Sequence, residues 1–344
     1  MNAFLAAIRT ALPEAELPNQ QLALEYPGWS ADKIHAKTGI STRRIAAPGE
    51  CASDLAWRAA RSLMEQESIE PACVDFLLYC TQTPDYILPP TACILQHRLG
   101  LPMSCGALDY NLGCSGYIYG LGLAKALIET GQARTILLLT ADTYSKLINP
   151  ADKSVRTLFG DGAAATLVKA GGEEPSIGPF VYGTDGGGAG NLIVPTGGMR
   201  RPVVFQAELL ADDSGNARTV NDLYMNGAEV FNFTLRTVPE AIEQLLAKAG
   251  IAQESVDLFV FHQANRFMLE HLRRKLQIPS EKFVIAMEEV GNTVSSSIPI
   301  ALEQAWKTGQ LTRRALVMLV GFGVGYSWGA TLIRWGDSSS SEAA

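Results

Sequence analysis

Residues 111–140 read NLGCSGYIYGLGLAKALIETGQARTILLLT, and this stretch decides which fold the chain can adopt. Cys114 stands near its start, and the small and apolar residues that follow favour a helix. TGQ at 130–132 places a glycine where helices commonly end. TILLLT at 135–140 predicts a strand that is covered on both faces. The stretch therefore predicts a helix that begins beside a cysteine and leads into a buried strand.

The same order of features returns at 291–320, in GNTVSSSIPIALEQAWKTGQLTRRALVMLV. Asn292 takes the place of Cys114, and the glycine of each TGQ lies 17 residues after the cysteine or the asparagine. ALVMLV at 315–320 repeats the buried strand. We interpret the two stretches as copies of one α/β unit, whose helix starts can meet near a pseudo-twofold axis.

The other segments alternate between strand-like and helix-like runs. Residues 1–18 fit a first strand better than a leader peptide, because they lack a basic start and a long apolar centre. Further strands are predicted at 74–80, 135–140, 163–168, 258–261 and 315–320. Helices are predicted at 52–66, 115–129, 228–249, 265–276 and 296–307. This order predicts α/β layers.

The length of 344 residues predicts two domains or two closely packed halves. We place the first half at 1–172, with Cys114, and the second at 173–336, with His262 and Asn292. Residues 183–221 are rich in turn formers, and we interpret them as a loop or flap over a site; a plain surface excursion is the alternative. The tail at 337–344 is small and polar, so we expect it to be disordered.

The composition excludes several classes of protein. Hydrophobic residues make up 47% and charged residues 18%, a normal balance for a chain with a core. The net charge of −7 disfavours broad attraction to nucleic acid or to an anionic membrane, and no apolar run is long enough to span one. Six cysteines without a CxxC pair and only four histidines make a metal site unexpected. With no export signal, we place the protein in a reducing cytoplasm.

Cys114 has the setting of a nucleophile. It lies at the predicted turn from a strand to a helix, where the helix dipole and nearby amides favour a thiolate. Its small neighbours Gly113 and Gly116 let a thioester approach the backbone. Taken alone, however, a buried cysteine is more often a small hydrophobic residue than a nucleophile.

Two further polar residues have settings that suit a site. His262 directly follows the strand predicted at 258–261, and open α/β sheets hold ligands at such strand ends. A core histidine bonded to backbone is the alternative. Asn292 lies at a predicted helix start, where a capping or turn asparagine is the commoner interpretation. The three residues become specific only in combination.

In this order and spacing, NLGCSGY, FVFHQANR, VGNTVSSSIPIAL and GFGVGYSWG resemble the ketoacyl-acyl carrier protein synthase III family of the thiolase superfamily. The resemblance runs nearly end to end and includes TGISTRRIA near the start and FGDGAAA at 159–165. It implies an α/β thiolase fold of five layers, αβαβα, with two pseudo-equivalent halves, and a homodimer. It also implies that Cys114, His262 and Asn292 form a catalytic triad that needs no metal or redox cofactor.

The chemistry implied by the resemblance needs these residue types. A thiolate takes an acyl group from a thioester, and the acyl-enzyme then reacts with an enolate formed from a malonyl thioester. His262 and Asn292 can donate hydrogen bonds to the enolate oxygen, while the backbone amides of Cys114 and Val324 would form the oxyanion hole for the acyl carbonyl. The family usually has glycine at position 324, so we expect a different local shape there. Asp161 in FGDG is expected to be structural, buried among turn amides.

Three positions depart from the family's coenzyme A site. Alignment on TGI places Lys33 where members have an adenine-stacking tryptophan, and alignment on FGDG places Lys153 at the partner arginine. Ala228 replaces an asparagine that holds the pantetheine arm. Lysines can still meet phosphates, but we expect the stacking surface to be absent. A carrier-protein thioester is then the expected acyl donor, and altered coenzyme A binding is the alternative.

Two surfaces are assigned by the resemblance. Arg273, Arg274 and Lys275 are expected to dock an acidic acyl carrier protein, with an ordinary solvated helix face as the alternative. Leu88 aligns with the residue that crosses the dimer interface to bound the acyl pocket. Several members have phenylalanine there, so leucine is expected to admit a longer or branched acyl group.

The sequence therefore predicts a 3-oxoacyl-acyl carrier protein synthase III type of acyltransferase. It would condense a Cys114-bound acyl group with malonyl-acyl carrier protein, with acyl carrier protein and an acyl thioester as partners. Acyl transfer to an alcohol or amine, in secondary metabolism or glycan biosynthesis, is the alternative, and Asn292 argues against it. A non-catalytic subunit of a condensing complex is a third possibility, against which the intact triad argues.

Overall fold

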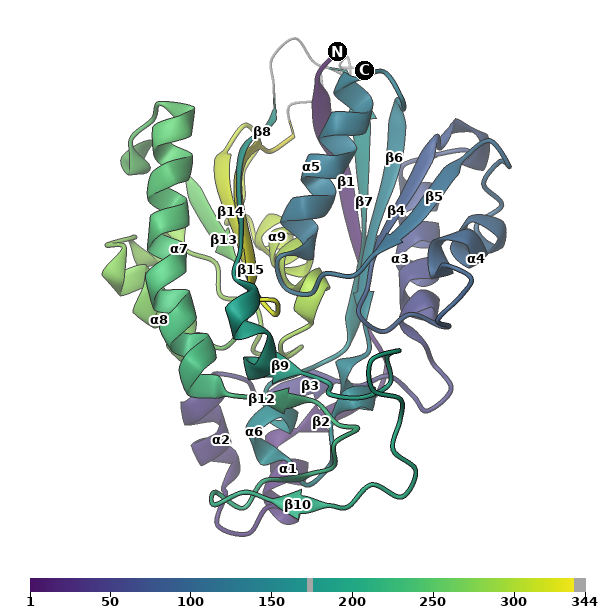
Figure 1. Ribbon diagram of the computed structural model, residues 1–344. Helices are drawn as coiled ribbons and strands as arrows, with labels where there is room; N and C mark the ends of the chain where they lie inside the picture. The colour runs from purple at the N-terminus through teal and green to yellow at the C-terminus, as the bar shows by residue number, and fades with distance from the viewer. Residues whose placement is uncertain (172–175, 337–344) are drawn as a thin grey trace.

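The computed structural model describes residues 1–171 and 176–336 and has five layers (Figure 1). Two sheets stand side by side, with helices between them and on both outer faces, which confirms the predicted αβαβα arrangement. The proposed boundary at 172/173 and the tail at 337–344 lie outside the described residues. No helix in the described ranges is long and apolar enough to cross a membrane.

The first sheet is built from the N-terminal part of the chain. Its order is β1-β7-β6-β4-β5, with β4 parallel to both of its neighbours and β7 antiparallel to both of its own. All eight residues of β6 are buried, as its apolar sequence predicts. The strands are β1 (Ala3–Ala11), β4 (Phe76–Cys80), β5 (Gly106–Tyr110), β6 (Thr135–Asp142) and β7 (Gly162–Ala170).

The second sheet is built from the C-terminal part. Its order is β13-β14-β15-β8, with β13 parallel to β14 and the other pairs antiparallel. The strands are β8 (Ile177–Thr184), β13 (Leu258–Phe261), β14 (Leu316–Gly323) and β15 (Ser327–Arg334). The central strands β6 and β14 are those predicted to follow the two TGQ turns.

Two helices fill the layer between the sheets. They are α5 (Gly116–Glu129) and α9 (Ser297–Lys307), and each contacts strands of both sheets. One hydrophobic cluster joins α5 and α9 to both sheets, so the main core lies in this layer. The outer faces are covered by α3 (Ala52–Gln66) and α4 (Thr91–Arg98) on one side, and by α7 (Gly227–Ala249) and α8 (Arg266–Lys275) on the other.

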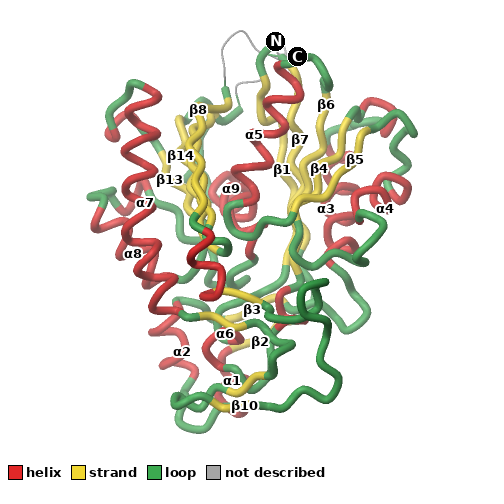
Figure 2. Tube along the Cα trace, in the orientation of Figure 1, coloured by secondary structure: helices red, strands yellow, loops and turns green. Residues whose placement is uncertain are grey.

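Short elements and long loops gather at one end of the molecule, at the bottom of Figure 2. The short helices there are α1 (Asn19–Glu25), α2 (Ala31–Thr38) and α6 (Lys153–Arg156). The short strands are β2 (Glu16–Pro18), β3 (Thr42–Arg44), β9 (Leu192–Ile193), β10 (Leu210–Ala211), β11 (Ala217–Arg218) and β12 (Tyr224–Met225). Residues 183–221, which we call the flap, are irregular as predicted and hold only the end of β8, one 3₁₀ helix and two-residue strands.

Candidate active site

A cavity of about 300 Å³ brings the three residues of the predicted triad together. Cys114, His262 and Asn292 all line it, although they come from both halves of the chain. Trp29 and Lys37 of the N-terminal segment also line it, together with Leu192 of the flap. The cavity therefore lies where the two halves and the loop-rich end of the molecule meet.

Cys114 lies at the start of α5, one residue before the N-cap Ser115, and is 5% exposed. The end of β14 passes directly beside it. A Cβ atom at Gly323 would lie 3.0 Å from the Cys114 sulfur, so a larger residue would crowd the thiol. The hydroxyls of Ser115 and Ser327 are 2.6 Å apart and tie the helix start to β15. The backbone at Gly323 therefore approaches the thiol closely on one side.

The protonation of Cys114 differs from the sequence expectation. Burial is the main effect and raises the pKa of the Cys114 thiol well above its ordinary value, and the nearby Asp142 carboxylate raises it further. A hydrogen bond from the backbone N–H of Cys114 itself acts in the opposite direction. Burial therefore shifts the pKa of Cys114 toward the neutral thiol, in the direction opposite to the one expected from the helix start.

His262 follows β13 and is 2% exposed. Its Nδ1 atom lies 2.7 Å from the Ser297 hydroxyl, which also accepts the backbone N–H of Gln263 at 3.4 Å. Burial lowers the pKa of His262 to about 3, so the ring is neutral near pH 7. The Ser297 hydroxyl can donate to Nδ1, and in that tautomer the neutral ring carries its proton on Nε2.

Asn292 is held by its neighbours so that its side-chain NH₂ group remains a donor. Its Oδ1 accepts the backbone N–H of Val294 at 3.0 Å, and its backbone N–H donates to Leu158 at 2.9 Å. Val294 has a φ of +53°, which a β-branched residue rarely adopts. Such strain costs about 1–3 kcal/mol and concentrates at functional sites. The turn therefore holds the Asn292 amide in one orientation.

Trp29 bears on the expectation that the cavity has no aromatic stacking surface. Trp29 lines the cavity just before α2, and the side-chain nitrogens of Lys33 and Lys37 each lie 5.4 Å from the centre of its ring. Lys33 occupies the aligned position, but the indole comes from four residues earlier. An aromatic ring therefore lines the cavity, although a lysine stands at the aligned position. Lys153 also lines the cavity, whereas Ala228 does not.

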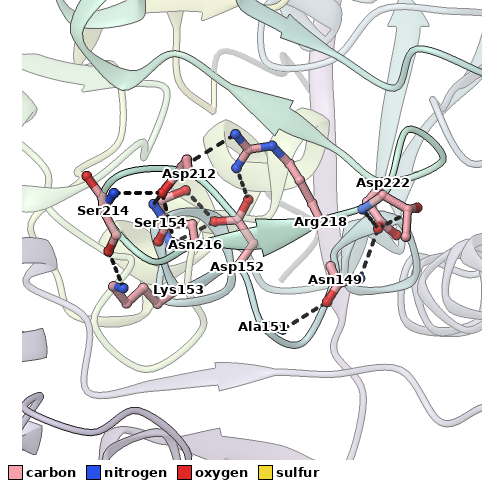
Figure 3. Close-up of polar contacts among 11 residues, drawn as sticks. Asn149, Ala151, Asp152, Lys153, Ser154, Asp212, Ser214, Asn216, Arg218 and Asp222 are labelled. Carbon is pink, nitrogen blue, oxygen red and sulfur yellow. Dashed lines mark hydrogen bonds and ion pairs between the residues drawn. The ribbon is translucent and has the colours of Figure 1, made fainter. Parts of the chain in front are cut away.

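The flap is fastened beside this mouth (Figure 3). The Arg218 guanidinium donates to the buried Asp152 carboxylate at 2.8 Å, and Lys153 donates to the backbone oxygen of Ser214 at 2.7 Å. Because Lys153 and flap residue Leu192 both line the cavity, the flap is part of the site and not a plain surface excursion.

The remaining predicted residues differ in how close they come to the cavity. Val324 contacts the apolar cluster that contains Cys114, and its side chain packs near Gly113. Leu88 is 77% exposed on the loop after β4 and does not line the cavity of its own chain. Asp161 is fully buried and accepts the backbone N–H groups of Ala46 and Ser145 at 2.8 and 3.0 Å, as a structural carboxylate would.

Two of the three basic side chains on α8, Arg273 and Lys275, make contacts within the chain. Arg273 pairs with Glu270 at 2.8 Å and donates to the backbone of Ile278, so it is engaged within the chain. Lys275 donates to the Leu235 backbone oxygen at 2.7 Å. Arg274 has 76% of its side chain accessible and lies 3.6 Å from the Glu270 carboxylate.

Two residues of the site were missed by the sequence analysis. Ser297 orients His262, yet it stands in a run of three serines that gives no sign of which one does so. Trp29 was not identified because the alignment was made on TGI alone. In the described part of the chain, no group of three or more histidine, cysteine or acidic side chains could hold a metal.

A buried cysteine at a helix start, a neutral histidine and a turn asparagine, shared between two similar α/β halves, define a condensing enzyme of the thiolase superfamily. Family models for the 3-oxoacyl-acyl carrier protein synthase III domain and its C-terminal domain match residues 108–186 and 246–335. A β-ketoacyl-acyl carrier protein synthase III of Caldanaerobacter subterraneus is 36% identical over 94% of this chain and 95% of its own.

Solved structures agree with this match. A crystal structure of a 3-oxoacyl-acyl carrier protein synthase III is 58% identical, with a TM-score of 0.96 over 97% of this chain and 100% of its own. A 3-oxoacyl-acyl carrier protein synthase from Burkholderia xenovorans is 37% identical, with a TM-score of 0.90 over 98% and 95%. The chain belongs to the β-ketoacyl-acyl carrier protein synthase III family and is an acyltransferase of that type.

Proposed function

We propose that Cys114, His262 and Asn292 catalyse a decarboxylative Claisen condensation between a Cys114-bound acyl group and a malonyl thioester. The observation that carries the proposal is that one cavity is lined by all three side chains, with the His262 and Asn292 donors both oriented by neighbours. The product would be a 3-oxoacyl thioester on acyl carrier protein. Thioesters supply all the reactive groups, so no cofactor is required.

The first step makes an acyl-enzyme. The Cys114 sulfur forms a bond to the acyl carbon, the bond from that carbon to the donor sulfur breaks, and the thiol proton leaves with the donor thiol. The backbone N–H groups of Cys114 and Val324 are assigned to the acyl carbonyl oxygen. A raised thiol pKa suits a cysteine that stays protonated until the thioester has entered and water has left.

The second step makes the carbon–carbon bond. The malonyl thioester loses carbon dioxide, and the electron pair forms an enolate whose oxygen accepts from Asn292 Nδ2 and His262 Nε2. The enolate carbon attacks the acyl carbon, the bond from that carbon to the Cys114 sulfur breaks, and the released thiolate takes up a proton from solvent to restore the thiol. A neutral His262 with a proton on Nε2 is a suitable donor, and the low pKa keeps the ring neutral.

Partners are proposed from the surface around the cavity. Trp29, flanked by lysines, suits the nucleotide end of a coenzyme A donor. Exposed Arg274, with Lys275 and the more engaged Arg273, is assigned to the docking of an acidic carrier protein. We also propose a homodimer that would bring Leu88 to the partner's acyl pocket, and a cytoplasmic location, which fits six unpaired cysteines.

The test is intact-mass analysis of the full chain after incubation with acyl-coenzyme A or acyl-carrier thioesters, followed by malonyl-carrier thioester. We expect one acyl mass on Cys114, then its loss together with release of labelled carbon dioxide. An adduct that forms but never triggers decarboxylation on any tested carrier would contradict condensation and favour transfer to an alcohol or amine.

A further inference from the structure

Asp142 is a buried carboxylate that neither reaction step uses. It is the last residue of β6, and its side chain is fully buried. Burial of a carboxylate costs free energy unless hydrogen-bond donors surround it. The donors around Asp142 come from both halves of the chain, and they connect it to the turns that carry Cys114 and Asn292.

The first donor belongs to the loop that packs against the Cys114 turn. The backbone N–H of Gln82 donates to Asp142 Oδ1 at 2.8 Å. The side-chain oxygen of Gln82 lies against Gly113, where an added Cβ would be 2.5 Å from it. The side-chain NH₂ of Gln82 donates to Asn111 at 3.0 Å. Gly113 directly precedes Cys114, so Gln82 connects the carboxylate to the turn that carries the nucleophile.

The other donors belong to the Asn292 turn. Ser295 lies in the 3₁₀ helix Val294–Ser296, and its backbone N–H donates to Asp142 Oδ2 at 3.2 Å. The Ser295 hydroxyl donates to the same oxygen. In the same 3₁₀ helix, the backbone N–H of Val294 donates to the side-chain oxygen of Asn292. Asp142 is therefore held between the two turns, and a movement away from either turn would break a buried hydrogen bond.

The titratable groups that interact with Asp142 do not include a cation. They are Tyr79 and Cys80 of β4, Tyr110 of β5, Cys114 before α5, Tyr144 of the 3₁₀ helix after β6, and Asp161 before β7. Burial is the main cause that raises the pKa of Cys114, and Asp142 is the second. Burial also raises the pKa of Asp142 itself to about 7. The negative charge that acts on Cys114 is therefore present above this pH and largely absent below it.

We propose that Asp142 is a positioning residue for the nucleophile: the turns of Cys114 and Asn292 hold it in place, and in its ionised form it keeps Cys114 as a thiol. A thiolate and an ionised carboxylate repel each other in one buried site, so Cys114 gives its proton to solvent more readily when Asp142 is neutral. The proposal rests on the proposed function only in that Cys114 is the nucleophile. It predicts that the reactivity of Cys114 responds to pH in two stages, which a purely structural carboxylate would not produce.

The test is the rate at which iodoacetamide alkylates Cys114 in the full chain from about pH 5 to about pH 9, because thiolates are the reactive form. Peptide mass mapping separates Cys114 from the exposed Cys73 and Cys93. In the wild type, we expect the rate to rise with pH, to flatten near pH 7 as Asp142 ionises, and then to rise again. A neighbouring like charge shifts a pKa by about one unit or more, so the flattening should lower the rate by about 10-fold against a straight extrapolation.

Three variants complete the design. Asp142→Asn keeps the shape of the side chain and removes the charge. Its rate should match the wild type below about pH 6 and exceed it by about 10-fold above about pH 8. Ser295→Ala removes a hydroxyl that stabilises the ionised carboxylate, so the flattening should move to higher pH. Asp75→Asn removes an exposed carboxylate that accepts the N–H of Thr135 at the other end of β6, and as the control it should keep the wild-type profile.

Two outcomes would overturn the proposal. One is a wild-type profile without the flattening near pH 7. The other is a ratio of Asp142→Asn to wild type that stays constant with pH, as a structural role alone would give. The wild-type and Ser295→Ala profiles keep the test decisive if Asp142→Asn does not fold. Failure of the proposed function looks different, because alkylation needs no thioester: the two stages would remain while no acyl adduct formed on Cys114.

Discussion

The two copies of the helix–TGQ–strand unit end alike and begin differently. Thr130 and Thr308 both cap their helices, with φ and ψ near −86° and −1° in one copy and −87° and −4° in the other. The following glycines, Gly131 and Gly309, have φ of +77° and +76°. Each threonine hydroxyl also bonds to the carbonyl four residues earlier, at 2.7 and 3.0 Å. The sequence repeat is therefore a structural repeat.

The starts of the two units have diverged toward different tasks. In the first, Cys114 stands directly before the N-cap of α5, and its own backbone N–H lies close to its sulfur. In the second, Asn292 lies five residues before α9, and a 3₁₀ turn with strained Val294 intervenes. One copy thus presents a nucleophile with backbone donors, and the other presents a side-chain donor on a strained turn. The shared scaffold fixes position, while the few residues before each helix decide the chemistry.

The largest expected effect comes from removing the nucleophile of the first copy. Cys114→Ala should abolish the acyl adduct and leave the fold intact, because alanine fits the narrow space beside Gly323. Intact mass after incubation with acyl thioesters measures the adduct. Cys93→Ala, which removes an exposed thiol, is the control and should keep the adduct. An adduct of one acyl mass on Cys114→Ala would place the nucleophile elsewhere.

The second effect concerns the carboxylate that joins the two copies. Asp142 accepts the Gln82 N–H of the first half at 2.8 Å and the Ser295 N–H of the second at 3.2 Å. Burial is the main cause that raises its pKa to about 7, from 3.8. Between these values the folded protein keeps a proton that the unfolded chain has lost, so this group's contribution to stability is full below about pH 4 and is lost as the pH rises through 7.

Asp142→Asn should remove that pH dependence. The free energy of unfolding of the variant, relative to wild type, should improve by up to about 4 kcal/mol between pH 4 and pH 8, as an upper limit. Urea unfolding of both proteins at a series of pH values measures this difference. The contributions of the other titrating groups are the same in both proteins and cancel. A relative stability that stays constant with pH would show that Asp142 titrates normally in the folded protein.

The third effect separates the two copies by reaction step. Asn292→Ala should leave Cys114 acylation nearly unchanged, since backbone amides are assigned to that oxyanion. It should cost about 3 kcal/mol, or roughly a hundredfold, in decarboxylation of the malonyl thioester. Asn292→Asp should be at least as harmful, because a carboxylate repels the enolate and cannot donate when ionised. Single-turnover acylation followed by labelled carbon dioxide release measures the two steps; equal losses in both would contradict the division of labour.

Much of this scaffold follows from local sequence. The helix predicted at 52–66 coincides with α3 (Ala52–Gln66), and the predicted strands match β4, β6, β7, β13 and β14 to within about three residues. Unbroken apolar runs and helix stops are short-range signals, and both reflect how the chain meets the core. The three residues proposed as the triad were singled out by the resemblance to the family and not by their positions alone, and the structure brings all three to one cavity.

The features that the sequence did not predict depend on contacts between segments that are far apart in the chain. The helix start at Cys114 was recognised, but the burial that raises its pKa comes from segments far away in the chain. Trp29 reaches the cavity from just before α2, and a linear alignment counts residues without knowing where the helix begins. Leu88 is exposed on the single chain, so the role proposed for it at an acyl pocket requires a second copy.

The smallest effect tests the repeat itself. Both TGQ glycines lie in the left-handed region, and a Cβ at either would meet nothing within 4 Å. Substitution should therefore cost only backbone strain, about 1 kcal/mol for alanine, and the same amount in both copies. Urea unfolding of Gly131→Ala and Gly309→Ala measures the two losses. Gly131→Asn and Gly309→Asn are the matched controls and should lose less, because asparagine tolerates this conformation. Losses that differ by more than about 1 kcal/mol would mean that the two units, alike in backbone, no longer contribute alike to the stability of the fold.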